Sequence, residues 1–322
     1  GVEFRNEGVK SNVLGKPMKE PQDVPFEKEG QYLKSDNRSN ISYFLEHNVL
    51  LRRFTLSVGV LANYNSALNE GIHFYPGIDA SYRIGDNVRL YGSWNRALRM
   101  PTFTDLYYEG KTNKGNPDLK PEESEAFEVG LKYNTYFLRA HIAGFYRKGK
   151  NMIDWVKEKP EDIWESQNLT KVDNLGFETN LSLLPRELGN ERFFIRKIEL
   201  GYAFIHQDKD SEGYISNYAL DYLKHKFTAQ LSHSIWKGFS ATWYVRWQDR
   251  AGSYTKYENL KPAYEEPYAP YCLVDMKVNW EYQRLNLYAE LNNLLNSTYY
   301  DLGNIPQPGI WFKAGFRYSF KY

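Results

Sequence analysis

Apolar and polar side chains alternate with a period of two along much of this chain. In residues 54–62, for example, Phe54, Leu56 and Val58 fall on one side and Thr55 on the other. The same alternation recurs at 138–147, 239–247 and 310–322. Because successive side chains of a β-strand point to opposite faces, the pattern predicts strands with one apolar and one polar face.

Extended along the whole chain, this pattern predicts about 14 strands. They lie near 2–11, 39–47, 50–62, 73–84, 87–97, 122–134, 136–158, 164–184, 195–207, 223–236, 238–249, 269–281, 284–294 and 308–322. Many segments reach about 10 residues, long enough to cross the apolar layer of a membrane as tilted strands. The strands of soluble β-sandwiches and propellers also alternate apolar and polar side chains, but the average strand of a soluble protein has only about 5 or 6 residues. We therefore expect an all-β chain that forms a transmembrane antiparallel β-barrel.

The connections between the predicted strands alternate in length. Short links occur at Gly85-Asp86, Asn134-Thr135, Trp236-Lys237 and Tyr282-Gln283, and long ones around 12–38, 98–121, 208–222, 250–268 and 295–307. Outer-membrane barrels combine short periplasmic turns with longer extracellular loops. The pattern therefore predicts that 98–121, 208–222 and 250–268 lie outside the cell and that the C-terminus lies at the periplasmic rim.

Composition excludes several other classes. Aromatic residues make up 16% of the chain, which is too high a content for a disordered protein. Its mean hydropathy of −0.66 is too polar for helical membrane spans. The 41 basic and 40 acidic residues leave a net charge of +1, so nucleic acid is not an expected partner. The chain opens on Gly1 without a signal peptide, and for an exported protein we expect further sequence upstream.

Two stretches of the sequence carry a family signature. Residues 96–107 and 115–124, followed by 128–133, are similar to the mid-barrel signature of TonB-dependent outer-membrane receptors. Residues 291–300 and 307–322 are similar to their closing strands. The terminal residues Gly315, Tyr318, Phe320 and Tyr322 also resemble the signal that the barrel assembly machinery recognises.

The resemblance implies a 22-stranded barrel with an N-terminal plug. Residues 1–322 would then be the C-terminal portion, with the plug, the TonB box and the first strands on sequence outside this chain. A complete 14-stranded barrel is the rival explanation, since it also has an even strand number. The expected partners are TonB, the barrel assembly machinery, outer-membrane lipid and a small bulky ligand, with a surface lipoprotein as a further candidate.

The implied function is TonB-dependent uptake of a scarce nutrient across the bacterial outer membrane, with no cofactor. Cobalamin or a related corrinoid is favoured by a general likeness to the cobalamin receptors of the family, and ferric siderophore and haem are close alternatives. A passive diffusion barrel, an adhesin or an enzyme barrel are the other hypotheses. The adjacent acids Glu122-Glu123 and Glu265-Glu266 should point to opposite faces, which disfavours a two-carboxylate hydrolase site. We therefore expect no catalytic residues.

Tyrosines concentrate in three clusters within the predicted loops: the first is Tyr107 and Tyr108 with Lys111 and Lys114, the second is Tyr214, Tyr218 and Tyr222, and the third is Tyr254, Tyr257, Tyr264 and Tyr268. The candidate ligand-binding residues are Tyr107, Tyr108, Lys111, Tyr214, Tyr218, Tyr254, Tyr257 and Tyr264. A tyrosine offers a large rigid face with a polar tip, which suits capture of a bulky amphipathic ligand. The alternative is that several belong to the aromatic girdle of a barrel. No histidine has the spacing of a metal site, and His206 with Asp208 and Asp210 offers too few oxygens for calcium.

Overall fold

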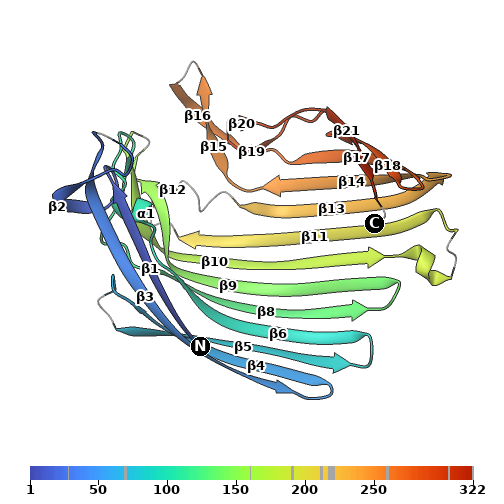
Figure 1. The fold of residues 1–322 in the computed structure, drawn as a ribbon, viewed down its shortest axis with the longest axis horizontal. Helices are drawn as coiled ribbons and strands as arrows, with labels where there is room; N and C mark the ends of the chain where they lie inside the picture. Colours follow the sequence, from blue (N-terminus) through green and yellow to red (C-terminus); the bar gives the residue numbers. More distant parts are fainter. Residues whose placement is uncertain are drawn as a thin grey trace.

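The chain forms one broad, curved antiparallel sheet in a computed structural model (Figure 1). The structure describes residues 1–27, 29–68, 71–159, 161–189, 192–210, 213–216, 222–258, 261–303 and 305–320. Among these residues, no helix is long and apolar enough to cross a membrane. The all-β class predicted from the sequence is confirmed.

Fourteen of the described strands follow one another in a single hydrogen-bonded ladder. Their bounds are β1 Val2–Ser11, β3 Gln31–Leu50, β4 Phe54–Asn65, β5 Ile72–Ile84, β6 Val88–Arg99, β8 Glu122–Asn134, β9 Leu138–Lys157, β10 Trp164–Leu183, β11 Ile195–Asp210, β13 Leu223–Trp236, β14 Phe239–Arg250, β17 Tyr271–Tyr282, β18 Leu285–Asn292 and β21 Trp311–Tyr318. Neighbours in this order are antiparallel. The number and order of the predicted strands are therefore confirmed.

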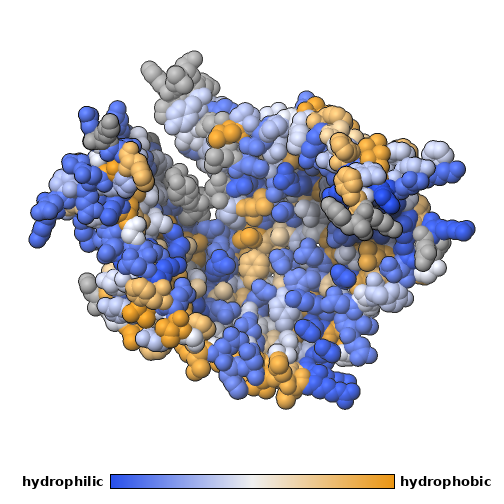
Figure 2. All heavy atoms as spheres, viewed as in Figure 1, coloured by the Kyte–Doolittle hydropathy of each residue, from blue (hydrophilic) through white to orange (hydrophobic). Residues whose placement is uncertain are grey.

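The pairing register gives the sheet one continuous apolar face, here called the outer face. Ile78 lies opposite Val58 and Trp94, and Phe127 lies opposite Trp94 and Tyr146. Large apolar side chains on this face are exposed, including Val129 and Ile142. Figure 2 shows hydrophobic side chains along the lower margin of the molecule, where Figure 1 places β4 and β5. A membrane barrel exposes such a band to lipid.

The opposite, inner face is polar and carries ion pairs between strands. Glu290 on β18 accepts from Lys277 on β17 and Lys313 on β21, each at 2.7 Å. On β6, Tyr91 donates its hydroxyl to Glu128 on β8 at 2.8 Å and lies 2.7 Å from His141 Nε2 on β9. Charged side chains on a face that does not contact lipid can interact with water or with other protein groups. A polar inner face of this kind is expected for the interior of a membrane barrel.

The two ends of the sheet differ as predicted. At the end called the turn end, short links join β5 to β6, β8 to β9, β13 to β14 and β17 to β18. The connection between β10 and β11 is longer and holds a 3-10 helix at Pro185–Leu188. The long connections lie at the other end, called the loop end.

Several of the predicted long connections contain short regular elements. The predicted link 12–38 holds β2 (Lys16–Asp23) and the first part of β3. The other elements are α1 (Phe103–Tyr107), β7 (Asn113–Lys114), β12 (Ile215–Ser216), β15 (Ser253–Glu258), β16 (Lys261–Pro267), β19 (Tyr300–Leu302) and β20 (Ile305–Pro306). Most of these segments pair with each other or with strand extensions, which their irregular hydrophobicity did not reveal.

Some strand boundaries were wrong. The strand predicted at 50–62 is Phe54–Asn65, because residues 51–53 form the turn after β3. The strand predicted at 308–322 is Trp311–Tyr318. No described strand pairs with the second edge of β1 or of β21, so the ladder of described residues is open at both edges.

Tyrosine rings on the inner face lie over glycines of the neighbouring strand. Tyr91 covers Gly130, and Tyr288 covers Gly315. In each case a lysine ammonium lies over the ring, with Lys132 Nζ 4.7 Å from the Tyr91 centroid and Lys277 Nζ 4.6 Å from that of Tyr288. Because glycine has no Cβ, the tyrosine ring can occupy the space above it, so packing requires glycine at these two positions.

Gly130→Ala is expected to lower the free energy of unfolding by about 1–3 kcal/mol, because the new methyl group overlaps the Tyr91 ring. Denaturant unfolding of the protein in detergent micelles measures the change. Gly144→Ala is the control, since a Cβ there meets nothing closer than the Gly176 carbonyl oxygen at 4.0 Å. Equal stability of the two variants would contradict the packing role of Gly130.

Candidate ligand-binding site

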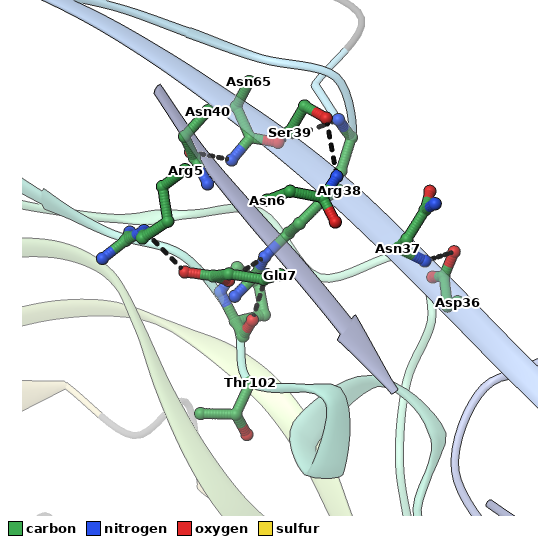
Figure 3. A network of polar contacts seen from close by, with 12 residues as sticks. Arg5, Asn6, Glu7, Asp36, Asn37, Arg38, Ser39, Asn40, Asn65 and Thr102 are labelled. Atoms are coloured by element: carbon green, nitrogen blue, oxygen red, sulfur yellow. Dashed lines mark hydrogen bonds and ion pairs between the residues drawn. The ribbon is translucent and has the colours of Figure 1, made fainter. Parts of the chain in front are cut away.

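The connection 98–121 folds back over the inner face and is held by a buried arginine. Arg38 on β3 is 8% exposed. Its Nη1 donates to the Pro101 carbonyl oxygen at 2.6 Å, and its Nε donates to Glu7 at 2.6 Å. Its guanidinium carbon lies 5.0 Å from the centroid of the Phe103 ring. Figure 3 shows Arg38 between Glu7 and the start of α1. One side chain therefore joins β1, β3 and the connection.

The short helix α1 is stabilised at its own N-terminus. Thr102 caps it, with its hydroxyl accepting from the Asp105 amide at 3.1 Å while the Asp105 carboxylate accepts from the Thr102 amide at 3.0 Å. At the end of the helix, Tyr107 donates its hydroxyl to Asp36 on β3 at 2.5 Å. Burial and this hydrogen bond to a carboxylate raise the pKa of Tyr107. Tyr107 therefore anchors the connection to β3.

The far end of the same connection is fixed to β8, β9 and β10. Arg99 donates two hydrogen bonds to Glu122, at 2.5 and 2.7 Å, and Glu122 also accepts from the Ile153 amide at 2.8 Å. The Asn168 side chain pairs with the backbone N–H and carbonyl of Lys120, at 2.8 and 2.9 Å. Between the anchored ends, Tyr108 is 39% exposed and Lys111 is exposed.

A cavity of about 500 Å³ lies at the inner face beside this connection. Its lining includes the charged side chains of Arg5, Glu7 and Arg38, and the neutral Asn40, Asn63 and Tyr75. In Figure 3, Asn40 and Asn65 are joined above Arg5 and Glu7; Asn65 donates to Asn40 at 2.6 Å. The cavity therefore combines a charged side with an uncharged, hydrogen-bonding side.

Three polar atoms of this lining have no hydrogen-bond partner within the described part of the chain. They are Asn40 Nδ2, Asn63 Oδ1 and the Tyr75 hydroxyl. The three residues are 5%, 8% and 8% exposed. A buried polar group without a partner costs about 1–3 kcal/mol, so water or a ligand is expected to supply partners here. No sequence pattern distinguishes these wall residues, because each occupies an ordinary inward position of a strand.

The second predicted tyrosine cluster is only partly within the described residues. Tyr214 is half-buried beside β12, and Tyr218 lies outside the described residues. β12 pairs with β9, and Ser216 donates its hydroxyl to Asp154. Lys209 Nζ lies 3.9 Å from Asp154, and burial lowers the pKa of Lys209. A water-excluded cluster thus fixes this loop to the sheet.

Two tyrosines of the third predicted cluster, Tyr254 and Tyr268, form an aromatic group with Tyr300 at the base of the β15–β16 hairpin. The Tyr254 ring lies 5.1 Å from that of Tyr268 and 5.6 Å from that of Tyr300. Lys256 Nζ is 5.9 Å from the centroids of both Tyr254 and Tyr300, and the Arg250 guanidinium lies 5.5 Å from that of Tyr268. Tyr300 was predicted only as part of the closing strands, so its place in this aromatic group was not foreseen.

The remaining predictions for these loops have mixed outcomes. Tyr257 and Tyr264 are 55% and 53% exposed and lie on the hairpin, outside the aromatic group. Glu265 accepts from Ser253 and Thr255, whereas Glu266 accepts from Tyr254 and Lys256, so the two acids do face apart. The described residues hold no cluster of His, Cys, Asp or Glu suited to a metal ion.

The C-terminal residues predicted as an assembly signal end the last strand. Gly315 lies in β21 under Tyr288, and Tyr318 ends that strand. The rings of Tyr318 and Phe320 are 5.0 Å apart and exposed. Tyr322 lies outside the described residues. Recognition by the assembly machinery stays a prediction.

The sequence model of the family described as "TonB dependent receptor-like, beta-barrel" matches residues 1–294. The chain belongs to the TonB-dependent receptor family. Members of this family are outer-membrane proteins, and they are receptors and transporters rather than enzymes. The outer-membrane location and the absence of an enzymatic role, both predicted from the sequence, are confirmed by this membership.

Curated relatives of this receptor chain include transporters and siderophore receptors. It is 25% identical over 191 residues to the vitamin B12 transporter BtuB of Vibrio vulnificus, covering 54% of this chain and 30% of that protein. It is 22% identical over 297 residues to the ferrienterobactin receptor of Escherichia coli, covering 83% of this chain and 38% of that protein. The chain thus spans about a third of the length of these relatives.

Solved receptors share the fold of this chain. The ferric enterobactin receptor of Pseudomonas aeruginosa, in a mutant form bound to enterobactin, superposes with a TM-score of 0.73 at 19% identity, covering 99% of this chain and 51% of that one. The siderophore receptor PirA of Acinetobacter baumannii gives a TM-score of 0.72 at 17% identity, with 99% and 51% covered. The barrel fold class predicted from the sequence is therefore confirmed.

Arg38→Met is expected to loosen the connection 98–121, since it removes charge-assisted hydrogen bonds to Glu7 and Pro101 worth about 1.5–3 kcal/mol. Amide hydrogen exchange in α1 measures the effect as faster exchange. Arg5→Met is the matched control, because Arg5 also pairs with Glu7 but its side chain is 60% exposed, and a surface pair contributes about 0–1 kcal/mol. Unchanged exchange in the Arg38 variant would contradict the anchoring role.

Proposed function

We propose that this chain is the ligand-capturing and pore-lining part of a receptor that takes up a scarce nutrient with energy delivered by TonB. The loop end faces the outside of the cell, as the alternation of short turns and long connections favours. Ligand meets the exposed tyrosines first and then the inner-face cavity beside the connection 98–121. Loops on a rigid scaffold are the usual place for such recognition.

The observation that carries this proposal is the cavity of about 500 Å³, in which Asn40 Nδ2, Asn63 Oδ1 and the Tyr75 hydroxyl have no partner among the described residues. These groups offer an amide donor, an amide acceptor and a hydroxyl, without net charge. A corrinoid carries many peripheral amides, which are both donors and acceptors. Cobalamin is therefore the favoured ligand, and the likeness to the vitamin B12 transporter of Vibrio vulnificus supports it.

A ferric siderophore is the second candidate, supported by a different observation. A second inner-face hollow is lined by Arg196, Lys277, Arg284, Lys313 and Arg317, with Glu281 and Glu290 as its acidic residues. Because Leu184, Gln283 and Arg284 of its lining lie at the turn end, this basic wall attracts an anionic chelate on its path through the barrel, after capture at the loop end. The likeness to the ferrienterobactin receptor of Escherichia coli points the same way.

We further propose that the open edges of β1 and β21 pair with strands of the same receptor to close a 22-stranded barrel around a plug. Residues 1–322 then supply the C-terminal portion of that barrel. TonB acts on the plug through a TonB box, the assembly machinery recognises the last strand, and a surface lipoprotein is a candidate partner at the loop end.

Tyr75→Phe is expected to weaken binding of the nutrient by roughly tenfold, the value of one hydrogen bond to a buried partner. Stability should stay unchanged or rise, because the variant removes a hydroxyl that lacks a protein partner. Equilibrium binding of the full-length receptor to cyanocobalamin, a ferric siderophore and haem measures the effect. Tyr64→Phe, on the outer face and 41% exposed, is the control.

The same ligands tested for uptake in cells, with and without TonB, separate this proposal from its rivals. Uptake that stops without TonB supports it. Passive entry of the ligand without TonB supports a diffusion barrel, and no uptake of any of the three ligands removes the transport proposal.

A further inference from the structure

The hairpin of β9 and β10 carries a further short strand on each of its edges at the loop end (Figure 1). On one edge, β7 pairs with β10, where Asn113 lies opposite Trp164, and the Trp164 amide donates to the Thr112 carbonyl oxygen at 2.9 Å. On the other edge, β12 pairs with β9, where Ser216 lies opposite Val156. The local strand order is therefore β7–β10–β9–β12.

The two outer strands of this small sheet come from connections that cross the hairpin. In the main ladder, β9 is flanked by β8, and β10 is flanked by β11. β7 belongs to the connection 98–121 between β6 and β8, yet it lies along β10. β12 belongs to the connection 208–222 between β11 and β13, yet it lies along β9. Each connection therefore holds the edge of the hairpin that is farther from its own origin.

One face of the hairpin lies against the inner face of the ladder. Asp154 on β9 accepts from the Ser216 hydroxyl of β12, and it lies 3.9 Å from Lys209 Nζ on β11. The register puts Lys209 on the inner face of the sheet. Asp154 and its neighbour Val156 are 2% and 0% exposed. The hairpin is thus folded inward and joined there to both β11 and β12.

The opposite face of the hairpin is covered by the connection 98–121. The Tyr108 ring meets the Trp155 ring edge-on, with 6.5 Å between their centroids. Trp155 is 8% exposed. Closer to the ladder, the Asn168 side chain holds the backbone of Lys120 from the same connection. The hairpin therefore touches one connection through β7 and this covered face, and the other through β12 and the buried Asp154.

We propose that the connections 98–121 and 208–222 are coupled through the β9–β10 hairpin, so that loosening either one loosens the other. Because the connections cross, neither can leave without releasing an edge of the hairpin. A released edge loses backbone hydrogen-bond partners. As a control of access to the nutrient cavity, this coupling rests on the proposed function, since residues 98–100 line that cavity.

Hydrogen exchange of the full-length receptor in detergent micelles, without nutrient, tests the coupling. Tyr108→Ala perturbs only the connection 98–121, because it removes the edge contact with Trp155. The amides of β12, on the other connection, are expected to exchange roughly two- to tenfold faster, the effect of losing one aromatic pair. Since no nutrient is present, the result does not depend on the proposed function.

The reverse experiment perturbs the connection 208–222. Ser216→Ala removes the hydroxyl that donates to the buried Asp154. Coupling between two sites is reciprocal, so the effect must also appear at β7. The Trp164 amide, which donates to Thr112, is expected to exchange roughly two- to tenfold faster, as for the loss of one buried hydrogen bond.

Two controls separate coupling from a general loss of stability. Tyr136→Ala is the matched control, because Tyr136 meets Phe137 edge-on at 5.2 Å at the turn end, and it should leave β12 exchange unchanged. Tyr108→Phe keeps the ring and should keep the slow exchange of β12. Unchanged β12 exchange in Tyr108→Ala, equal acceleration by Tyr136→Ala, or acceleration that extends to β4 would overturn the proposal.

Discussion

One hydrogen-bond ladder, whose register is constant from β3 to β10 and shifts at bulges near the ends of β11 and β13, is the constraint on which the rest of this structure depends. Inside an apolar bilayer no water satisfies backbone N–H and C=O groups, so each strand must pair along its length with its neighbours. Constant register then fixes every side chain to one face, because a slip by a single residue would exchange the two faces. The row from Val58 to Tyr146 stays apolar across successive strands for this reason.

Once the ladder pairs the backbone N–H and C=O groups, the side chains of the inner face can differ from one region to another. It carries the Glu290 ion pairs on one side of the sheet and the cavity with Asn40, Asn63 and Tyr75 on another. The connection 98–121 uses this freedom by folding inward onto Arg38 rather than extending away from the sheet. The proposed ligand site is thus built from strand walls and an anchored loop together.

The sequence predicted the strand order well because the alternation is a direct consequence of the bilayer. It predicted β1 at residues 2–11, and the structure places it at Val2–Ser11. It also located Tyr107, but not the use of its hydroxyl as an anchor to Asp36. That contact joins residues far apart in the chain, and no local pattern encodes it.

The residues of the cavity wall could not be predicted from the sequence for a related reason. Asn40, Asn63 and Tyr75 look like any polar or amphipathic inward residues of a strand, and only the register brings them together. The hairpin of β15 and β16 was likewise missed, since Lys261–Pro267 contains two prolines and does not alternate. Long-range pairing and loop packing are therefore the parts that required a structure.

The most direct test of the two-faced ladder is the accessibility of spin labels placed one at a time at residues 56–61 of β4. The full-length receptor in a lipid bilayer, with Cys272 replaced by serine, provides the background. The account predicts high oxygen accessibility at 56, 58 and 60 and lower oxygen accessibility at 57, 59 and 61, with a period of two. Uniform accessibility along the strand, or the opposite phase, would contradict it.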